Sequence, residues 1–178
     1  FNLKKSLLKM IAEEAAAAKA GKPARIIAKL NALTDPDMIK ALYSASMAGV
    51  SIELIIRGIC CLKPGMAGIS ENIRVVSIIG RFLEHSRVYY FQNSQPQLYC
   101  SSADWMERNL SNRIEVCFPI LKKRHQARVL AELELYLADE SQSWELDAEG
   151  NYTERRNLQN KDGEVGLGVQ QTLLELLA

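Results

Sequence analysis

The chain has 178 residues, of which 48% are hydrophobic, and this is enough to bury one sizeable core in a single domain. Its 22 Lys and Arg residues are nearly balanced by 21 Asp and Glu residues, so the net charge of +1 excludes a broad electrostatic attraction to nucleic acid or to an anionic membrane. Any site that binds anions must therefore be local.

The N-terminal segment predicts a helix followed by a strand. Apolar residues within residues 3–15 recur at helical spacing. Gly21 and Pro23 then end the helix in the way expected of these two residue types. Residues 24–30, ARIIAKL, form a short apolar run that predicts a strand.

A second helix and a second strand follow directly. Thr34 or Asp35 is expected to cap a helix that has Pro36 in its first turn and ends at Gly49. Residues 50–57, VSIELIIR, are apolar and rich in β-branched side chains, as is typical of a strand. Strand, helix and strand within about 35 residues indicate two parallel strands joined by a right-handed crossover. We therefore expect a sheet that is covered by helices.

The remainder of the chain predicts further strands, one long helix and a polar C-terminal part. Four more strand-like runs, with a turn at 93–96 between the second and the third, are 72–78, 87–91, 97–102 and 113–120. Residues 122–138 return to helical spacing. The polar part then predicts a small hairpin around Glu149 and Gly150, a glycine-rich connector at 161–168 and a short amphipathic helix at 169–178. We expect that helix to dock on this domain or on a neighbour.

Cations follow the first two predicted strands. In open α/β sheets, ligands collect at the carboxyl ends of parallel strands. The first strand ends at Lys29, with Asn31 just beyond, and the second ends at Arg57 and Gly58, where a glycine would allow a ligand close to the backbone. Lys29 and Arg57 would converge on one crevice, and phosphate is the obvious ligand for a guanidinium group. The alternative is that both side chains simply leave the sheet for solvent.

His85 and Arg87 are the second candidate pair. They are two positions apart, so in strand conformation their side chains would share one face of the sheet. An imidazole beside a guanidinium suits phosphoryl chemistry, because the histidine can attack or move a proton while the arginine offsets the charge on phosphoryl oxygens. The alternative is that His85 is a hydrogen-bonded structural residue at the start of an ordinary strand.

Polar side chains also follow the predicted strand 97–102. Ser101, Ser102 and Asn109 carry hydroxyl and amide groups that can hydrogen-bond phosphate oxygens. The alternative is a helix cap formed by Ser102 or Asp104. The second histidine, His125, lies in a basic stretch of a predicted amphipathic helix, and we interpret it as a solvated surface residue without a chemical role.

The spacing of potential ligands encodes no metal site. The two histidines are far apart in the chain, and no paired C-x-x-C spacing links the four cysteines, Cys60, Cys61, Cys100 and Cys117. Adjacent Cys60 and Cys61 cannot easily bridge each other, so we expect reduced thiols and a cytoplasmic protein. The chain also lacks a G-x-x-x-x-G-K-[ST] phosphate loop and a G-x-G-x-x-G turn, so basic side chains must hold any bound nucleotide.

No transmembrane or targeting segment is expected. No apolar run approaches the roughly 18 residues that a membrane-spanning helix requires. The N-terminus has neither the apolar stretch nor the cleavage site of a signal peptide. Because the chain opens at Phe1 rather than at Met, we expect it to be a piece of a longer protein.

Several long blocks of the sequence resemble one known family. They are IIAKLNALTDPDMIKALYSASMAGVSIELIIRGICCLKPG, SENIRV, GRFLEHSR and SSADWMERNLSNRIEV. From Phe1 to Arg156 the chain is similar to the C-terminal catalytic region of bacterial polyphosphate kinase of the long, multidomain type. The resemblance implies an α/β fold, a phospholipase-D-like mixed sheet flanked by helices on both faces, over residues 1–156. Residues 157–178 would be a polar, glycine-rich tail with a short terminal helix.

The resemblance also implies an activity. The family transfers the terminal phosphate of ATP reversibly to inorganic polyphosphate through a phosphohistidine, which belongs to a preceding domain that this chain lacks. By resemblance, His85 acts in proton transfer or charge stabilisation and Arg57 binds ATP phosphates. Mg²⁺ would accompany ATP and be held mainly by the missing domain. We therefore expect ATP, ADP, polyphosphate, the preceding domain and further copies of the chain as partners, and a fragment that is inactive alone. The location implied is cytoplasmic, with peripheral contact to the inner membrane left open.

Two alternatives remain at this stage. One is a phospholipase-D-like phosphodiesterase that completes its site by dimerising, and the other is a non-catalytic module that binds polyphosphate. The wider superfamily has an H-x-K-x-x-x-x-D motif, which appears here as His85, Arg87 and Gln92, so the lysine is replaced and the aspartate is absent. The later G-S-x-N element reads SSAD over residues 101–104. These departures favour the kinase over the phosphodiesterase.

Overall fold

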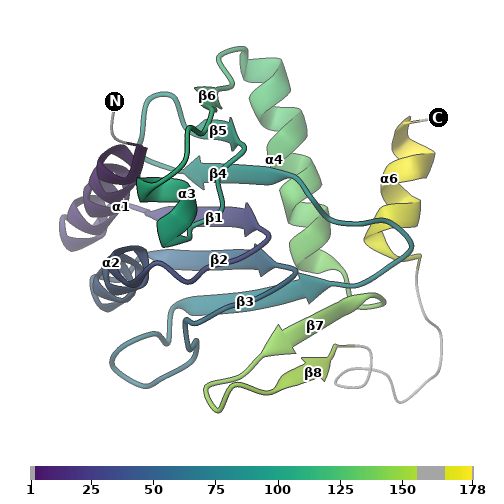
Figure 1. The fold of residues 1–178 in the computed structure, drawn as a ribbon, viewed down its shortest axis with the longest axis horizontal. Coiled ribbons are helices and arrows are strands. Elements are labelled where there is room, and N and C mark those ends of the chain that lie inside the picture. Colours follow the sequence, from purple (N-terminus) through teal and green to yellow (C-terminus); the bar gives the residue numbers. More distant parts are fainter. Residues whose placement is uncertain (1–2, 156–166, 178) are drawn as a thin grey trace.

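A computed structural model of the chain describes residues 3–155 and 167–177. Within these residues the strands form one eight-stranded mixed sheet in the order β6-β5-β4-β1-β2-β3-β7-β8 (Figure 1). Their bounds are β1 Arg25–Leu30, β2 Ser51–Ile56, β3 Ile73–Ile78, β4 Arg87–Phe91, β5 Leu98–Ser101, β6 Cys117–Pro119, β7 Ser143–Leu146 and β8 Tyr152–Glu154. Strands β1, β2 and β3 are mutually parallel, and the remaining pairings are antiparallel.

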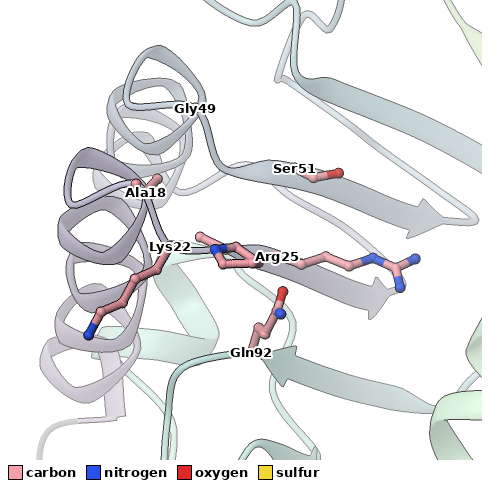
Figure 2. A pocket seen from close by; sticks show the side chains of 9 residues that line it. Ala18, Lys22, Arg25, Gly49, Ser51 and Gln92 are labelled. Atoms are coloured by element: carbon pink, nitrogen blue, oxygen red, sulfur yellow. The ribbon is translucent and has the colours of Figure 1, made fainter.

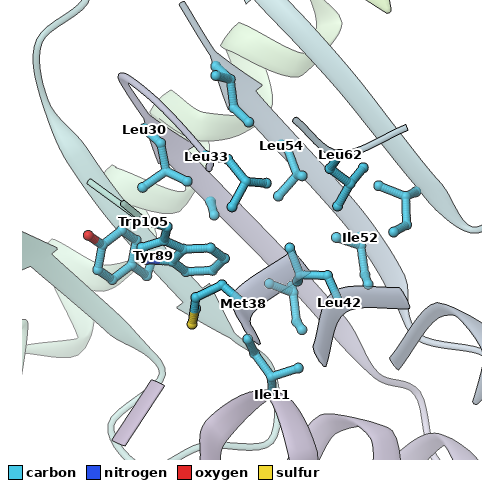
Figure 3. Close-up of a cluster of buried hydrophobic side chains, with 14 of the residues drawn as sticks. Ile11, Leu30, Leu33, Met38, Leu42, Ile52, Leu54, Leu62, Tyr89 and Trp105 are labelled. Atoms are coloured by element: carbon cyan, nitrogen blue, oxygen red, sulfur yellow. The ribbon is translucent and has the colours of Figure 1, made fainter. Parts of the chain in front are cut away.

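Helices cover both faces of the sheet, as predicted. Their bounds are α1 Leu3–Lys19, α2 Pro36–Met47, α3 Glu107–Ser111, α4 Lys123–Ala138 and α6 Val169–Leu177. One hydrophobic cluster joins α1 and α2 to the sheet, and Figure 3 shows it around Met38, Leu54 and the Tyr89–Trp105 pair, whose ring centroids are 5.3 Å apart. A second cluster joins α4 and α6 to the opposite face through Leu133, Leu137 and Val169. The α/β fold with a mixed sheet between helices is therefore confirmed.

The local signals explain the first strand–helix–strand unit. Gly21 and Gly49 have φ angles of 72° and 95°, a region that favours glycine, and each follows the end of a helix. Of the two predicted caps, Asp35 is the N-cap of α2, because its carboxylate accepts hydrogen bonds from the backbone N–H groups of Asp37 and Met38. The parallel pairing of β1 and β2 confirms the prediction for this unit.

One predicted strand is much shorter than expected. The run 113–120 was expected to be extended throughout, but β6 covers only Cys117–Pro119 and the short helix α3 precedes it. β6 is an edge strand, paired to β5 alone, and Pro119 offers no N–H to a further neighbour. Ile114 is fully exposed, so nothing in the described structure packs against the start of this run. The prediction was wrong there because an apolar run does not by itself provide a strand to pair with.

The C-terminal part forms the predicted hairpin and a docked helix. Strands β7 and β8 pair antiparallel, with Gly150 at a φ of 95° in the turn between them. The predicted connector, apart from Leu167 and Gly168, lies outside the described residues. Helix α6 packs on α4 of this domain (Figure 1). No helix in the described residues combines the length and apolar character needed to cross a membrane.

Candidate functional site

One edge of the sheet gathers most of the predicted site residues. The parallel strands β1, β2 and β3 all end there, and β4 begins there because it runs antiparallel to β1. Strand β5 runs antiparallel to β4 and so ends at the same edge, where Arg87 is paired with Ser101. This edge therefore receives the residues after β1 and β2, the 79–86 loop after β3, and the segment 101–104 after β5 (Figure 1).

Lys29 is buried beneath this edge and does not reach solvent. Its side chain is only 2% exposed, and its ammonium Nζ lies 4.8 Å from the centre of the Tyr136 ring on α4. Nζ forms an ion pair with Glu84 and donates a hydrogen bond to Ser86, at 2.9 Å in each case. Burial lowers the pKa of Lys29, and the carboxylate of Glu84 opposes that shift. Lys29 thus fixes the residues on both sides of His85.

His85 and Arg87 lie side by side, although His85 is not in a strand. Arg87 is the first residue of β4, and His85 is an exposed residue of the loop before it. Nη1 of Arg87 donates a 2.9 Å hydrogen bond to the backbone carbonyl of His85 and lies 3.2 Å from Nδ1 and 3.4 Å from Nε2 of its imidazole ring. The predicted neighbourhood therefore exists, but the arginine grips the loop instead of sharing a strand face with the histidine.

Asp104 links the cations to the loop after β1, and sequence reasoning missed this role. Its carboxylate accepts hydrogen bonds from Nε and Nη2 of Arg87 at 3.3 and 3.0 Å. It also accepts from the backbone N–H groups of Asn31 and Ala32, at 2.7 and 3.2 Å. Burial alone would raise the pKa of Asp104, but the hydrogen bonds from Arg87 and Asn31 outweigh it and hold this pKa below its ordinary value.

Asp104 is not the helix cap that one interpretation of the sequence predicts. Helix α3 begins at Glu107, and its N-cap is Met106. The position of Asp104, three residues after the end of β5, is the available signal, because the end of β5 lies at the same edge as the end of β1. A carboxylate at that position can therefore meet cations from β4.

Arg57 joins the same set of contacts through Asn31. Its Nε donates a 2.7 Å hydrogen bond to Oδ1 of Asn31, whose Nδ2 lies 3.4 Å from Asp104. Arg57, Asn31, Asp104, Arg87 and His85 thus form one continuous chain of contacts, which we call the edge network. Within the described residues, the two Nη atoms of Arg57 have no hydrogen-bond partner. They remain available to an anion.

Gly58 has a structural role at the edge network that the sequence does not predict. A Cβ atom at this position would lie 2.7 Å from the backbone carbonyl oxygen of Asn31, closer than such atoms approach. The Gly58 N–H donates a 2.9 Å hydrogen bond to that same oxygen. The glycine therefore allows the loop after β1 to approach the loop after β2, and this approach brings Asn31 to Arg57.

Ser101, Ser102 and Asn109 belong to a separate cluster. The Ser102 hydroxyl and the Asn109 amide both donate hydrogen bonds to the carboxylate of Glu115, the latter at 2.6 Å. Ser101 Oγ donates to the backbone carbonyl of Val116 at 3.0 Å. These groups hold the segment before β6 in place, and the negative charge of Glu115 opposes a phosphate beside Ser102 and Asn109. The structure does not bring the three residues into the edge network.

The described residues contain no group of three or more His, Cys, Asp and Glu side chains that could hold a metal ion. Near the edge network, the two carboxylates are paired with cations, Glu84 with Lys29 and Asp104 with Arg87. Mg²⁺ prefers oxygen ligands that are free to coordinate it, so these side chains do not fit a magnesium site. His125 is exposed on α4, as predicted.

A pocket at the opposite edge of the sheet has no part in the edge network. Figure 2 shows it beside the amino ends of β1 and β2, next to Lys22, Arg25 and Ser51. Its volume is about 530 Å³. Gln92, which occupies the position of the aspartate in the phospholipase D motif, lines this pocket, at the far end of β4 from His85. The guanidinium of Arg25 is held by Glu53 and Glu134.

A family model and several known proteins match this chain over most of its length. The family model described as polyphosphate kinase C-terminal domain 2 matches residues 1–165. A polyphosphate kinase of Pseudomonas aeruginosa is 56% identical over 100% of this chain, and a polyphosphate kinase 1 of Chlorobaculum tepidum is 53% identical over 88% of it. The chain spans 26% of the length of the first of these relatives and 23% of the second.

Solved structures agree with the sequence relatives. The crystal structure of polyphosphate kinase from Porphyromonas gingivalis matches 99% of this chain with a TM-score of 0.91 and 37% identity, and the match covers 27% of that protein. NucT from Helicobacter pylori and the phospholipase D family member Nuc from Salmonella typhimurium match with TM-scores of 0.53 and 0.52. Their identities are 12% and 18%, so these two show a shared phospholipase-D-like fold and nothing more.

Proposed function

The chain belongs to the family of polyphosphate kinase C-terminal domains, and we propose that its edge network is one half of an active site that transfers the terminal phosphate of ATP reversibly to inorganic polyphosphate. The observation that carries this proposal is the continuous chain of contacts from Arg57 through Asn31, Asp104 and Arg87 to His85. It joins an exposed imidazole to two guanidinium groups at the carboxyl edge of the sheet. Such a combination suits phosphoryl transfer, because positive groups stabilise phosphoryl oxygens while an imidazole can move protons.

Each member has a distinct role in this proposal. Arg57 binds ATP phosphates through its free Nη atoms, while its Nε is held by Asn31. His85 is the catalytic residue of this domain and acts in proton transfer or charge stabilisation near the transferred phosphate. Arg87 is held by Asp104 and keeps the His85 ring in position. Lys29 holds Glu84 and Ser86, the two neighbours of His85 in the chain, and Ser101, Ser102 and Asn109 hold the segment before β6 without direct contact to phosphate.

The other half of the site lies outside this chain. The curated relatives are about four times as long as the part that this chain matches, which leaves room for a preceding domain that carries the phosphohistidine. The carboxylates of the edge network are already paired, so the residues that would hold Mg²⁺ belong to the other half of the site. Assembly of several copies and a cytoplasmic location, where ATP is available, complete the proposal.

Arg57 provides the test of nucleotide binding. In a full-length polyphosphate kinase that carries this domain, we expect Arg57→Ala to raise the KM for ATP by about tenfold to a hundredfold, because charge-assisted hydrogen bonds of about 1.5–3 kcal/mol are lost. Arg113→Ala is the control, since Arg113 is exposed on the loop after α3 and outside the edge network. Steady-state kinetics of ATP-dependent polyphosphate synthesis measure both variants. Equal KM values for the two variants would remove Arg57 from the nucleotide site.

The phosphodiesterase alternative has weaker support. It rests on the likeness to NucT and Nuc, which concerns the fold alone at these identities. The histidine-lysine-aspartate motif of that superfamily is also incomplete here, because Arg87 and Gln92 stand at the lysine and aspartate positions. Gln92 lies at the opposite edge of the sheet from His85 and takes no part in the edge network. The kinase proposal therefore uses more of the residues that the structure brings together.

A further inference from the structure

The loop that carries His85 has few attachments of its own. Residues 79–86 connect β3 to β4, and within 80–86 no hydrogen bond between two backbone groups joins the loop to the part of the chain that the structure describes. Exposed side chains in this stretch include those of Arg81, Phe82, Leu83 and His85. A loop of this kind is held in one conformation only by side chains from elsewhere. Side chains that do so include Lys29 and Arg87 near its end and Gln170 in the middle.

Gln170 makes a set of hydrogen bonds to this loop that is unusual for a residue on a terminal helix. It is the second residue of α6 and is 5% exposed. Its Oε1 accepts a 2.9 Å hydrogen bond from the backbone N–H of Phe82. Its Nε2 donates to the backbone carbonyl of Phe82 at 2.8 Å and to the carboxylate of Glu84 at 2.6 Å. The single amide group therefore pairs with both backbone groups of Phe82, much as a neighbouring strand would.

Gly80 is shaped to admit this contact. A Cβ atom at position 80 would lie 2.4 Å from Oε1 of Gln170 and 2.9 Å from Nε2 of Gln142. Only glycine leaves the space into which the Gln170 amide fits. The absence of a side chain at Gly80 and the amide of Gln170 on α6 therefore fit each other in shape.

Helix α6 is itself anchored where Gln170 projects from it. The backbone N–H of Val169 donates a 2.5 Å hydrogen bond to the carboxylate of Asp139, at the end of α4. Val169 is 3% exposed and belongs to the hydrophobic cluster on this face of the sheet. The outer end of the helix is less engaged, because Leu174 and Leu176 are exposed. The first turn of α6 is therefore the part that is held, and it is the part that contacts the loop (Figure 1).

Glu84 connects the two attachments. One of its carboxylate oxygens accepts from Gln170 and the other pairs with Lys29. His85 follows Glu84 directly, and Ser86, the next residue, is bonded to Lys29 as well. Displacement of Phe82 or Glu84 would therefore move the imidazole relative to Arg87 and Arg57.

From these contacts we propose that Gln170, and through it the C-terminal helix α6, is a positioning residue that holds the His85 loop in the conformation required for phosphoryl transfer. This inference rests on the proposed function of His85. Gln170 touches neither His85 nor a site where phosphate would lie, and it acts through Phe82 and Glu84. The C-terminal helix is in this account part of the active-site apparatus rather than a separate tail.

Kinetics of the full-length polyphosphate kinase test the proposal. Gln170→Ala should lower kcat by about tenfold to a hundredfold, the loss expected when a catalytic group is misplaced by about 1 Å, and leave the KM for ATP within about twofold. Gln171→Ala is the matched control, because Gln171 is the next residue of α6, is exposed, and among the described residues its side chain bonds to Glu175 of the same helix and not to the loop. Gln171→Ala should behave as the wild type. A kcat for Gln170→Ala equal to that of Gln171→Ala would overturn the proposal.

A second variant guards against general unfolding. Gln170→Met keeps the approximate size of the buried side chain and adds no charge, but it removes both the acceptor for the Phe82 N–H and the donors to Phe82 and Glu84. We expect it to lose activity as Gln170→Ala does while its Tm stays closer to that of the wild type, because no cavity is left. Wild-type activity in Gln170→Met would overturn the proposal, because the hydrogen bonds of the amide would then be dispensable.

Hydrogen exchange separates this proposal from the proposed function. In Gln170→Ala, exchange of the Phe82 backbone amide, whose N–H donates to Gln170, should accelerate by at least about tenfold, the factor that corresponds to 1.4 kcal/mol of lost protection, with no such change in Gln171→Ala. Unchanged exchange would show that Gln170 does not hold the loop. If exchange accelerates in Gln170→Ala but His85→Ala is fully active, then Gln170 does hold the loop and the proposed function of His85 is rejected instead. Loss of activity in His85→Ala, with Gln170→Ala fully active, would reject only the positioning role.

Discussion

At the scale of single residues, the site depends on two buried ion pairs with different partners. Arg87–Asp104 connects β4 to the loop after β1, and several backbone and side-chain groups share its charges. Lys29–Glu84 has fewer partners and is deeper, with side chains 2% and 10% exposed. Burying an ammonium group is unfavourable unless its counter-ion is present. The carboxylate of Glu84 is therefore important both for stability and for the place of His85.

Removal of the Glu84 carboxylate should destabilise the domain. Glu84→Gln keeps the shape of the side chain and leaves the Lys29 ammonium buried without a counter-ion. We expect the free energy of unfolding of the 178-residue chain to fall by about 3 kcal/mol. The double variant Lys29→Met with Glu84→Gln should recover most of this loss, because neither charge is then buried. Urea unfolding measures both, and a double variant no more stable than the single one would contradict this account of the pair.

The difference in unfolding free energy between the wild type and Glu84→Gln should depend on pH. Burial alone would raise the pKa of Glu84, but hydrogen bonds from Lys29 and Gln170 outweigh it, so this pKa is lowered in the folded state. A carboxyl group with a lowered pKa adds stability that is fully present above its unfolded pKa of about 4.5 and is lost as the pH falls through the folded value. The stability difference between the wild type and Glu84→Gln should therefore be constant near neutral pH and shrink under acid. A difference that persists at the same size in acid would contradict the assigned cause.

Sequence reasoning found the cations of the site but not the groups that arrange them. Lys29, Arg57 and Arg87 could be placed at one edge because each adjoins a predicted strand. Asp104 and Glu84 were missed in their structural roles, because nothing local distinguishes a carboxylate that pairs across the sheet from one that caps a helix or faces solvent. The same limit applies to Ser102 and Asn109, whose partner Glu115 lies in a segment that was predicted to be a regular strand.

At the scale of elements, the first strand–helix–strand unit is defined by local signals. Asp35 begins α2, and Gly49 follows its end. Asp35 is fully buried and also forms an ion pair with Lys4 on α1. This ion pair connects α1 to the start of α2. Asp37 binds the same Lys4 ammonium but is exposed. The two aspartates thus form a natural matched pair for measuring the cap.

Asp35→Ala should destabilise the chain much more than Asp37→Ala. The first variant removes the acceptor of two backbone N–H groups at the start of α2, which we expect to cost about 1–2 kcal/mol of the unfolding free energy. Asp37→Ala removes only an exposed ion pair and should leave the unfolding free energy close to that of the wild type. Urea unfolding of both variants provides the measurement. Equal effects would mean that the ion pair to Lys4, and not the cap, is the stabilising feature.

The elements that were predicted less well depend on contacts between distant parts of the chain. The run 113–120 has the composition of a strand, but its position at the edge of the sheet leaves only Cys117–Pro119 paired. The terminal helix was predicted from its apolar spacing, yet its docking place was not. Val169 packs against α4, and Gln170 contacts the 79–86 loop. Gln170 and its partner Phe82 are 88 residues apart in the sequence. No local pattern encodes such a contact.

At the scale of the whole molecule, the described residues supply only part of the site that the proposed function requires. The edge network supplies an imidazole and cations, but its carboxylates are paired and do not fit a metal ion. This chain matches about a quarter of the length of its curated relatives. Under the proposed function, this domain binds the nucleotide and stabilises charge, and the phosphohistidine lies in a part of the kinase outside this chain.

The activity of the full-length kinase with His85 replaced tests this account most directly. The chain contains its own control, because its only other histidine, His125, is exposed on α4 and outside the edge network. We predict that His85→Ala lowers the kcat of ATP-dependent polyphosphate synthesis by about a hundredfold or more, as expected for loss of a group that moves protons, while His125→Ala keeps the wild-type rate and both variants keep the wild-type Tm. A folded His85→Ala enzyme that is as active as His125→Ala would contradict the account.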